Sequence, residues 1–428
     1  MDSCSDAVSI DGTTVSEADD RVATLTASGG SGDIGLRVLA ILSVLLAFAA
    51  LSTDIYLPAL PTMAAQLHSD QDAMAWTLSG YLIGFSIGQL LWGPIGDRYG
   101  RRLPVAVGLA LFVIGSAACA LSVNAGEIIG WRIVQAIGAC ASVVLGRAMV
   151  RDLYAGVRAA QMLSTLMTVM AIAPLLGPFV GGQIIRFASW QAIFWLLMAI
   201  GAMTLAALFT LPETLPAARR NREPLGRAWA GYLVLLRTRR VIGFAGVGGF
   251  FYGGIYAYLS GTPFAYINYY HLPAQWYGVV FGCGILGIMA CNLINVRLVV
   301  RHGAGGLIKM GAAGAAVAGV VVAIDARTGF GGLPGLVAPL FVYVGLAGFI
   351  IANSIAGALE SYPDRAGAVS ALVGAIHYGA GVVTAGLVGA FADGTPWSMG
   401  WIIAACGLGA AGCAWLAIPG RGKRVLAR

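Results

Sequence analysis

Long apolar runs alternate with short polar segments along nearly the whole chain. A membrane-spanning helix needs about 20 predominantly apolar residues, and the chain holds about twelve runs of that length. The least distinct boundary is the one between the third and fourth runs, because only Asn124 to Glu127 separate them. The pattern therefore predicts an all-α integral membrane protein. The predicted spans lie near residues 36–60, 73–95, 104–123, 127–150, 162–186, 190–211, 241–267, 275–299, 306–324, 335–358, 366–391 and 396–418.

The positive charges gather in alternate loops. Loops after the even-numbered spans hold most of the Lys and Arg residues, whereas the other loops hold chiefly Arg186 and Arg327. Because cytoplasmic loops carry an excess of Lys and Arg, this pattern places both termini in the cytoplasm. Arg147, one helical turn before Arg151, is expected to extend its side chain to the cytoplasmic surface.

Composition agrees with a membrane protein. The chain is 58% hydrophobic and 11% charged, whereas soluble domains carry about 25% charged residues. The net charge of +7 comes from the basic loops, so we expect no nucleic-acid partner. The seven cysteines form no CxxC pair, and neither a metal site nor a cofactor is expected.

The longest charged stretch, residues 212–240, divides the chain into two halves. The loop DRYGRR from Asp97 has a weak echo in VRHGAG from Val300, which supports an internal repeat. Two six-helix halves around a central loop are typical of transporters with parallel repeats, which bind substrate near the midplane. The predicted units are a disordered acidic tail (1–34), the first half (35–211), a cytoplasmic loop (212–240), the second half (241–418) and a basic tail (419–428).

One acidic residue, Asp54, lies inside the first apolar run. An ionised carboxylate at membrane depth costs about 2.5–3.5 kcal/mol on insertion scales. Counting from the span ends places Arg132 of the fourth span at a similar depth. The two side chains could pair, or compete for a shared proton or substrate. A change in that balance during a conformational cycle would make Asp54 load and release a proton. The alternative is a static ion pair that locks the helices together.

Helix breakers follow Asp54 directly, at Pro58 and Pro61. Proline removes a backbone donor and frees a carbonyl. We favour the interpretation that the helix ends here at the membrane interface. The alternative is a bend that shapes the mouth of a cavity.

The sequence GPIGDRYGRR follows the second span. Glycines at its start allow tight packing at the helix end, and Gly100 allows a turn conformation closed to most residues. Asp97 beside three arginines makes a charge cluster that could hold one gate state. The alternative is an ordinary basic loop. The predicted gate consists of Gly93, Asp97, Arg98, Gly100, Arg101 and Arg102.

The fifth span contains APLLGPFVGG, which is unusually rich in helix breakers. The interpretations are a kinked helix or a pliable seam between the two halves. The residues concerned are Pro174, Gly177, Pro178, Gly181 and Gly182.

Several polar and aromatic residues are candidates for lining a substrate cavity. Tyr252 and Tyr256 belong to an aromatic-rich stretch that could equally fill the core or face lipid. His377 is alone in an apolar run and is either a hydrogen-bonded core residue or a proton or ligand site. The remaining candidates are Tyr56, Tyr81, Gln89 and Gln135.

These motifs resemble those of the major facilitator superfamily, and specifically of its drug:proton antiporters in the bicyclomycin and chloramphenicol/florfenicol resistance group. The resemblance covers nearly the whole chain after the tail, and it implies the major facilitator fold in a bacterial inner membrane. It also implies that Asp54 is the protonation site, that Arg132 is its coupling partner and that the fifth-span motif marks export. The matching segments are STDIYLPALP from Ser52, GPIGDRYGRR from Gly93, RIVQAIGACAS from Arg132, GPFVGG from Gly177 and ETLP from Glu213.

Three functions follow as alternatives. The first is proton-coupled export of small amphipathic drugs such as chloramphenicol, florfenicol or bicyclomycin, for which a monomer is sufficient. The second keeps the fold but moves a small metabolite such as an amino acid, dipeptide or sugar. The third is a membrane enzyme or receptor, against which the absence of a nucleophile–base pair, metal cluster or phosphate loop in the sequence argues.

Overall fold

The computed structural model describes residues 31–154, 156–221, 223–360, 362 and 365–418. The predicted basic tail and most of the predicted acidic tail lie outside the described residues. The first helix begins at Ser31, so the last residues assigned to the acidic tail belong to this helix.

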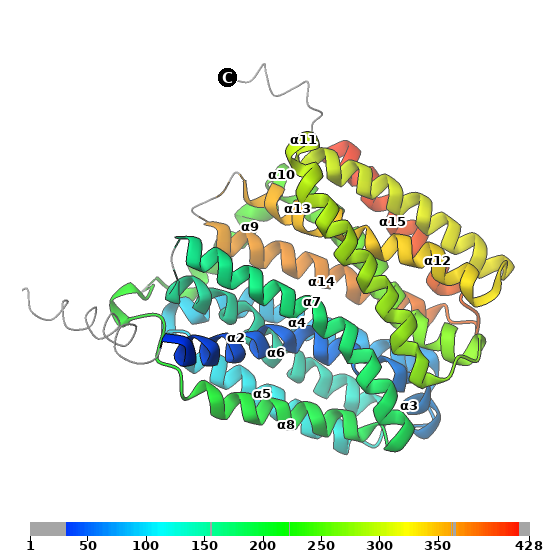
Figure 1. Ribbon diagram of the computed structural model, residues 1–428, viewed down its shortest axis with the longest axis horizontal. Helices are drawn as coiled ribbons and strands as arrows, with labels where there is room; N and C mark the ends of the chain where they lie inside the picture. The colour runs from blue at the N-terminus through cyan, green and yellow to red at the C-terminus, as the bar shows by residue number, and fades with distance from the viewer. Residues whose placement is uncertain (1–30, 155, 222, 361, 363–364, 419–428) are drawn as a thin grey trace, which may run out of the picture.

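The first half of the chain forms a bundle of helices (Figure 1). Every predicted span of this half coincides with a helix. The elements are α2 (Ser31–Asp54), η1 (Leu57–Ala59), α3 (Leu60–Gln66), α4 (Gln71–Tyr99), α5 (Arg102–Leu121), α6 (Ala125–Leu153), α7 (Gly156–Phe187) and α8 (Gln191–Leu208).

A short connecting region and a second bundle follow. The predicted central loop contains two helical segments, η2 and α9, so part of this region is helical rather than irregular. The elements are η2 (Ala217–Arg219), α9 (Leu225–Leu236), α10 (Arg239–Pro263), η3 (Phe264–Tyr269), α11 (Ala274–Thr328), α12 (Gly332–Gly345), α13 (Ala347–Leu359), α14 (Ala366–Ala390) and α15 (Trp397–Ala417).

Helix α11 combines the eighth and ninth predicted spans. Its backbone leaves the helical conformation at Gly303, where φ is 70° and ψ is 160°. A side chain is disfavoured at this φ, so glycine allows the reversal. Figure 1 shows the two arms of α11 meeting in a sharp bend. The predicted break between the eighth and ninth spans is confirmed.

Nine stretches of the described residues are long and apolar enough to cross a membrane. Helix α11 counts once among them although it supplies two spans, and α12 and α13 together form a single stretch. Helices α4 and α7 carry the remaining predicted spans. The twelve-span pattern is therefore consistent with the helices of the structure.

Two helix pairs join the halves. Helix α4 packs along α14, and α7 packs along the first arm of α11. Small residues allow close approach in the first pair, where Ser86 Oγ donates to the carbonyl oxygen of Ala375 at 2.9 Å. Small side chains at helix interfaces bring backbones together within lipid.

Candidate functional site

Helix α2 breaks immediately after Asp54 and resumes through η1 and α3. Leu57, Pro58 and Ala59 are fully buried at this break. The apolar stretch continues to Gln66, so the expectation that the helix ends at the interface is wrong. The prolines instead stand at a buried break between two helical segments.

Asp54 is buried, with 4% of its surface exposed. A methyl group placed on Gly177 of α7 would lie 3.3 Å from Asp54 Cβ. One turn further, a methyl group on Gly181 would lie 1.7 Å from the carbonyl oxygen of Ile55. The glycines of the fifth-span motif thus let α7 approach the backbone of the α2 break, which is a contact within the first half.

Arg132 on α6 is fully buried and reaches α2. Its Nη1 donates to the carbonyl oxygen of Ser52 at 3.0 Å and to Gln135 Oε1 at 2.8 Å. Gln135 is held in turn by its Nε2, which donates to Ser116 Oγ at 2.8 Å. Among the described residues Arg132 forms no ion pair with Asp54. The two are close in depth, but a static ion pair is not present in this conformation.

Two tyrosine rings flank the Arg132 guanidinium. Its Cζ lies 4.2 Å from the centre of the Tyr56 ring and 4.3 Å from that of Tyr81. Contacts of this kind stabilise a cation in a desolvated site. Nε and Nη2 have no hydrogen-bond partner in the described part of the chain. Both tyrosines therefore belong to the surroundings of Arg132, next to the α2 break.

The gating motif is built around Arg101, in the connection from α4 to α5. Arg101 donates to Asp97 Oδ1 at 2.6 Å and to Asp152 Oδ2 of α6 at 2.8 Å. Burial lowers the pKa of the Arg101 guanidinium, but Asp152 and Asp97 outweigh this effect and raise it. The side chain is thus a permanent cation that ties the end of α4 to the end of α6.

The three arginines of the motif do not form one cluster around Asp97. Arg98 donates to the carbonyl oxygen of Glu223, and Arg102 donates to that of Phe209. The prediction of a single charge cluster is correct only for Arg101. Asp152 was not among the predicted gate residues, although it stands beside Arg151 in the last turn of α6.

Glu213 is a second partner of the motif that lies outside the predicted gate. Its carboxylate accepts from the backbone N–H groups of Arg101 at 2.8 Å and of Arg102 at 3.2 Å. It stands in the ETLP segment, for which the resemblance was the only signal. Glu213 therefore fixes the turn after α4 to the segment after α8.

The glycines of the motif have different roles. Gly100 has φ 93° and ψ 178°, so the predicted special turn is confirmed. A methyl group on Gly96 would lie 2.3 Å from Leu145 Cδ2, which confirms tight packing there. A methyl group on Gly93 would meet nothing within 4 Å, so the packing interpretation is wrong for Gly93.

Replacing Gly100 with Ala should destabilise the protein by roughly 1–3 kcal/mol, because its backbone conformation is essentially restricted to glycine. The added methyl group would also lie 2.6 Å from Glu213 Oε2. Thermal unfolding of the purified protein in detergent would measure the change. Gly93→Ala is the matched control, and equal unfolding temperatures for the two variants would contradict the prediction.

The fifth-span motif also contributes to the seam between the halves. A methyl group on Gly182 would lie 2.7 Å from the carbonyl oxygen of Ala274 on α11. Opposite, a methyl group on Gly278 would lie 2.3 Å from the backbone nitrogen of Phe179. Pro174 and Pro178 lie inside α7, which is assigned as helix across both. Gly177 and Gly181 of the motif thus contact the α2 break, whereas Gly182 contacts α11 of the second half.

An aromatic cluster lies between the halves. The Tyr378 ring centre of α14 is 4.4 Å from that of Phe85 on α4 and 5.9 Å from those of Tyr252 and Tyr256 on α10. His377 stacks on Tyr252 at 4.8 Å and is 2% exposed. Its Nε2 has no hydrogen-bond partner among the described residues. His377 is therefore a core residue here, but not one held by a hydrogen bond from that atom.

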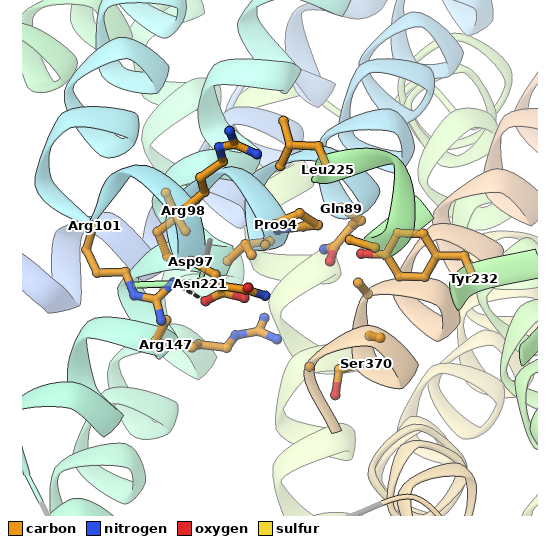
Figure 2. A pocket seen from close by; sticks show the side chains of 18 of the residues that line it. Gln89, Pro94, Asp97, Arg98, Arg101, Arg147, Asn221, Leu225, Tyr232 and Ser370 are labelled. Atoms are coloured by element: carbon orange, nitrogen blue, oxygen red, sulfur yellow. Dashed lines mark hydrogen bonds and ion pairs between the residues drawn. The ribbon is translucent and has the colours of Figure 1, made fainter. Parts of the chain in front are cut away.

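A cavity of about 470 Å³ opens where α4 and α6 end and α14 begins. We call this the basic end of the bundle, because Arg98, Arg101, Arg147 and Arg151 line the cavity. Figure 2 shows its walls, with Gln89 and Pro94 of α4, Tyr232 of α9 and Ser370 of α14.

Of the predicted cavity residues only Gln89 lines this cavity. Tyr56, Tyr81 and Gln135 surround Arg132 instead, and Tyr252, Tyr256 and His377 belong to the aromatic cluster. Phe85 lies one helical turn from Gln89 on one side and one turn from Tyr81 on the other. The aromatic cluster therefore separates the cavity at the basic end from the surroundings of Arg132.

Comparisons with known proteins agree with this architecture. The chain matches the family model described as the Major Facilitator Superfamily over residues 42–385. The fold is shared with a xylose transporter of E. coli (XylE), with a TM-score of 0.70, 16% identity and coverage of 90% of this chain and 98% of the other. It is shared equally with a nucleoside transporter (NupG), with a TM-score of 0.72, 16% identity and coverage of 89% and 100%.

Three curated relatives have higher sequence identity. An uncharacterised MFS-type transporter of Bacillus subtilis (YdgK) is 34% identical, over 84% of this chain and 90% of its own length. A bicyclomycin resistance protein homologue of Haemophilus influenzae is 29% identical, over 87% and 93%. A chloramphenicol resistance protein of Pseudomonas aeruginosa is 31% identical, over 80% of both chains. The chain therefore belongs to the Major Facilitator Superfamily, and it is a multi-pass membrane transporter of small molecules rather than an enzyme.

Proposed function

We propose that this protein exports small amphipathic drugs in exchange for protons, as a member of the bicyclomycin and chloramphenicol/florfenicol resistance group. The names of two relatives support this substrate class, since they are a bicyclomycin resistance homologue and a chloramphenicol resistance protein. The motifs STDIYLPALP and GPFVGG support the same assignment, because they meet in space at the α2 break.

Asp54 is the observation that carries proton coupling. It is a buried carboxyl group at a helix break, without an ion pair among the described residues. An ionised carboxylate is costly in such surroundings, whereas a protonated one is neutral. Proton binding therefore favours the closed surroundings of Asp54, and proton loss favours a state that admits water or substrate. Proton occupancy and conformation are coupled in this way.

Arg132 supplies the second charge of the proposed coupling site. It holds the carbonyl oxygen of Ser52, two residues before Asp54, and so is anchored to the same part of α2. Nε and Nη2 have no hydrogen-bond partner among the described residues. A small rearrangement of the break would let these donors meet the ionised Asp54 after proton release. Arg132 then stabilises the deprotonated state of the cycle.

The cavity at the basic end is the proposed inward-facing route for substrate. We propose that this end, with both chain termini, faces the cytoplasm of a bacterial inner membrane, which the excess of Lys and Arg in the basic loops supports. The aromatic cluster around Tyr378 closes the route toward Arg132 in this conformation. Rocking of the halves at the α4–α14 and α7–α11 seams would open and close it. Since the route lies within one chain, a monomer is sufficient.

Inverted membrane vesicles would test the proposal. With an inward-acid proton gradient, they should accumulate chloramphenicol or florfenicol, and adding drug should release protons from the vesicle lumen. A small-metabolite transporter of the same fold would show neither effect with these drugs. Drug accumulation that survives collapse of the proton gradient would contradict proton exchange, and absence of drug-dependent proton movement across a panel of drug classes would contradict drug export.

A further inference from the structure

Positive charge dominates the walls of the cavity at the basic end. Its lining includes the arginines 98, 101, 147 and 151, but only Asp97 and Glu223 among acidic residues. Subtracting these two acids from the four arginines gives a net charge of +2 for the described lining. A concave surface of one sign concentrates ligands of the opposite sign.

Most of these charges are already engaged. Arg101 is neutralised by Asp97 and Asp152, and Arg98 donates to the carbonyl oxygen of Glu223. Glu223 itself lies 3.7 Å from Arg227 of α9. None of these groups is therefore free to bind a ligand without losing an existing contact.

Arg147 is different. It is an exposed residue of α6, and within the described ranges it forms neither a hydrogen bond nor an ion pair. The same is true of Arg151, which lies one helical turn nearer the end of α6 and also lines the cavity. Figure 2 shows its side chain extending into the cavity, below Asn221 and toward the wall formed by α14. The Arg147 guanidinium thus lines a cavity at the basic end that is formed by helices of both halves, and its extension to the cytoplasmic surface remains a prediction.

The wall around Arg147 suits an amphipathic molecule. Val144 and Leu145 of α6, Pro94 of α4 and Ala371 of α14 provide apolar surface. Gln89 lies at the inner part of the cavity, two helical turns inside Asp97, and supplies an uncharged polar group. A ligand of drug size would thus meet apolar walls and the neutral amides of Gln89 and Asn221. It would also meet two guanidinium groups, those of Arg147 and Arg151, that have no described ion pair.

We propose that Arg147 is a specificity-determining residue that selects amphipathic organic anions at the inward-facing cavity. This inference rests on the proposed export function and names the substrate class of that site. A guanidinium pairs with a carboxylate through two parallel hydrogen bonds, which favours anions bearing a planar carboxylate. The same charge disfavours cationic amphiphiles of equal size.

Three compounds with one scaffold provide the test. Chloramphenicol is neutral, its hemisuccinate ester carries a carboxylate, and its deacylated amine carries an ammonium group. Binding to the purified full chain in nanodiscs would be measured by calorimetry without a proton gradient. We expect the hemisuccinate to bind more tightly than the amine. Arg147→Gln should weaken hemisuccinate binding about tenfold, as for loss of a charge-assisted pair, and leave chloramphenicol nearly unchanged.

Further variants separate a local effect from a change in net charge. Arg147→Lys should retain most of the hemisuccinate affinity, and Arg147→Glu should reverse the preference toward the amine. Arg186→Gln is the matched control. It removes the same charge from an exposed arginine in the last turn of α7, which is not part of the cavity lining. Raising the salt concentration should weaken hemisuccinate binding more in the wild type than in Arg147→Gln, because the variant keeps fewer positive charges in the lining.

Three outcomes would overturn the inference. They are failure of the hemisuccinate to bind at millimolar concentration, equal affinity of the wild type and Arg147→Gln for it, and an equal loss in Arg186→Gln. Each is distinct from failure of the proposed function, because the binding assay needs no gradient and the vesicle assay uses the neutral drug. Proton-coupled export of chloramphenicol together with any of these outcomes would leave export standing and remove only the charge selectivity.

Discussion

The Asp54→Asn variant should lose proton-coupled drug export, with drug-induced proton release from inverted vesicles falling to background. Asparagine keeps the size and polarity of the protonated acid but cannot titrate. Asp54 is buried at the α2 break and forms no ion pair among the described residues, so no neighbouring acid there can take over its proton. The measurement is proton release on drug addition, together with drug resistance in a sensitive host.

The pH dependence of drug binding gives a second measurement on the same variant. If drug and proton compete through Asp54, wild-type affinity rises as the pH rises and the proton leaves. In Asp54→Asn the affinity should not change over the same range. Asp54→Glu should keep part of the coupling, because it retains a titratable group near the same place.

Asp393→Asn is the control for loss of an acidic charge. Asp393 is exposed in the connection before α15, where its Oδ1 accepts from the backbone N–H of Thr395 at 2.9 Å. This variant should transport like the wild type. Unchanged proton release and resistance in Asp54→Asn would remove Asp54 from the coupling mechanism.

The Gly181→Ala variant should lose both stability and transport. Its methyl group would lie 1.7 Å from the carbonyl oxygen of Ile55 and 3.2 Å from Pro58 Cγ. A backbone oxygen cannot rotate away as a flexible side chain can, so α7 or the α2 break has to move. Overpacking of this kind typically costs about 1–3 kcal/mol. The movement also displaces the backbone that positions Asp54.

The Gly130→Ala variant is the matched control on α6. A methyl group there would meet nothing within 4 Å, and alanine favours a helix over glycine by about 0.5–1 kcal/mol. Unfolding temperature in detergent and efflux rate would be measured for both variants. Equal behaviour of Gly181→Ala and Gly130→Ala would show that the α2–α7 contact is not as close as described.

The sequence predicted the fold well because its dominant signal is local. Burial in lipid requires a long apolar run for each span, so the transfer free energy of consecutive side chains is recorded directly along the chain. The special conformation at Gly100 was also predicted, because it depends on the backbone freedom of one residue. The break between the eighth and ninth spans was predicted from the basic residues that follow the eighth span, without a role for Gly303. The boundaries of the two halves remain predictions.

The hydrogen-bond and ion-pair partners of the charged residues could not be predicted from local sequence. Depth counting brought Arg132 to the level of Asp54, yet the guanidinium binds the carbonyl oxygen of Ser52. Counting along a helix gives height but not the direction in which a side chain points. The choice between a carboxylate and a backbone carbonyl depends on packing between helices far apart in the sequence.

Sequence alone thus determined the helical spans, the alternation of basic loops and the motifs that meet near Asp54. Only the tertiary structure decided that the chain stays buried and helical through η1 and α3 after α2 ends. The same holds for the open space beside Gly93 and for the position of Arg147 in a cavity. The physical reason is that hydropathy sums contributions of neighbouring residues, whereas cavities and ion pairs arise from the shape complementarity of distant helices.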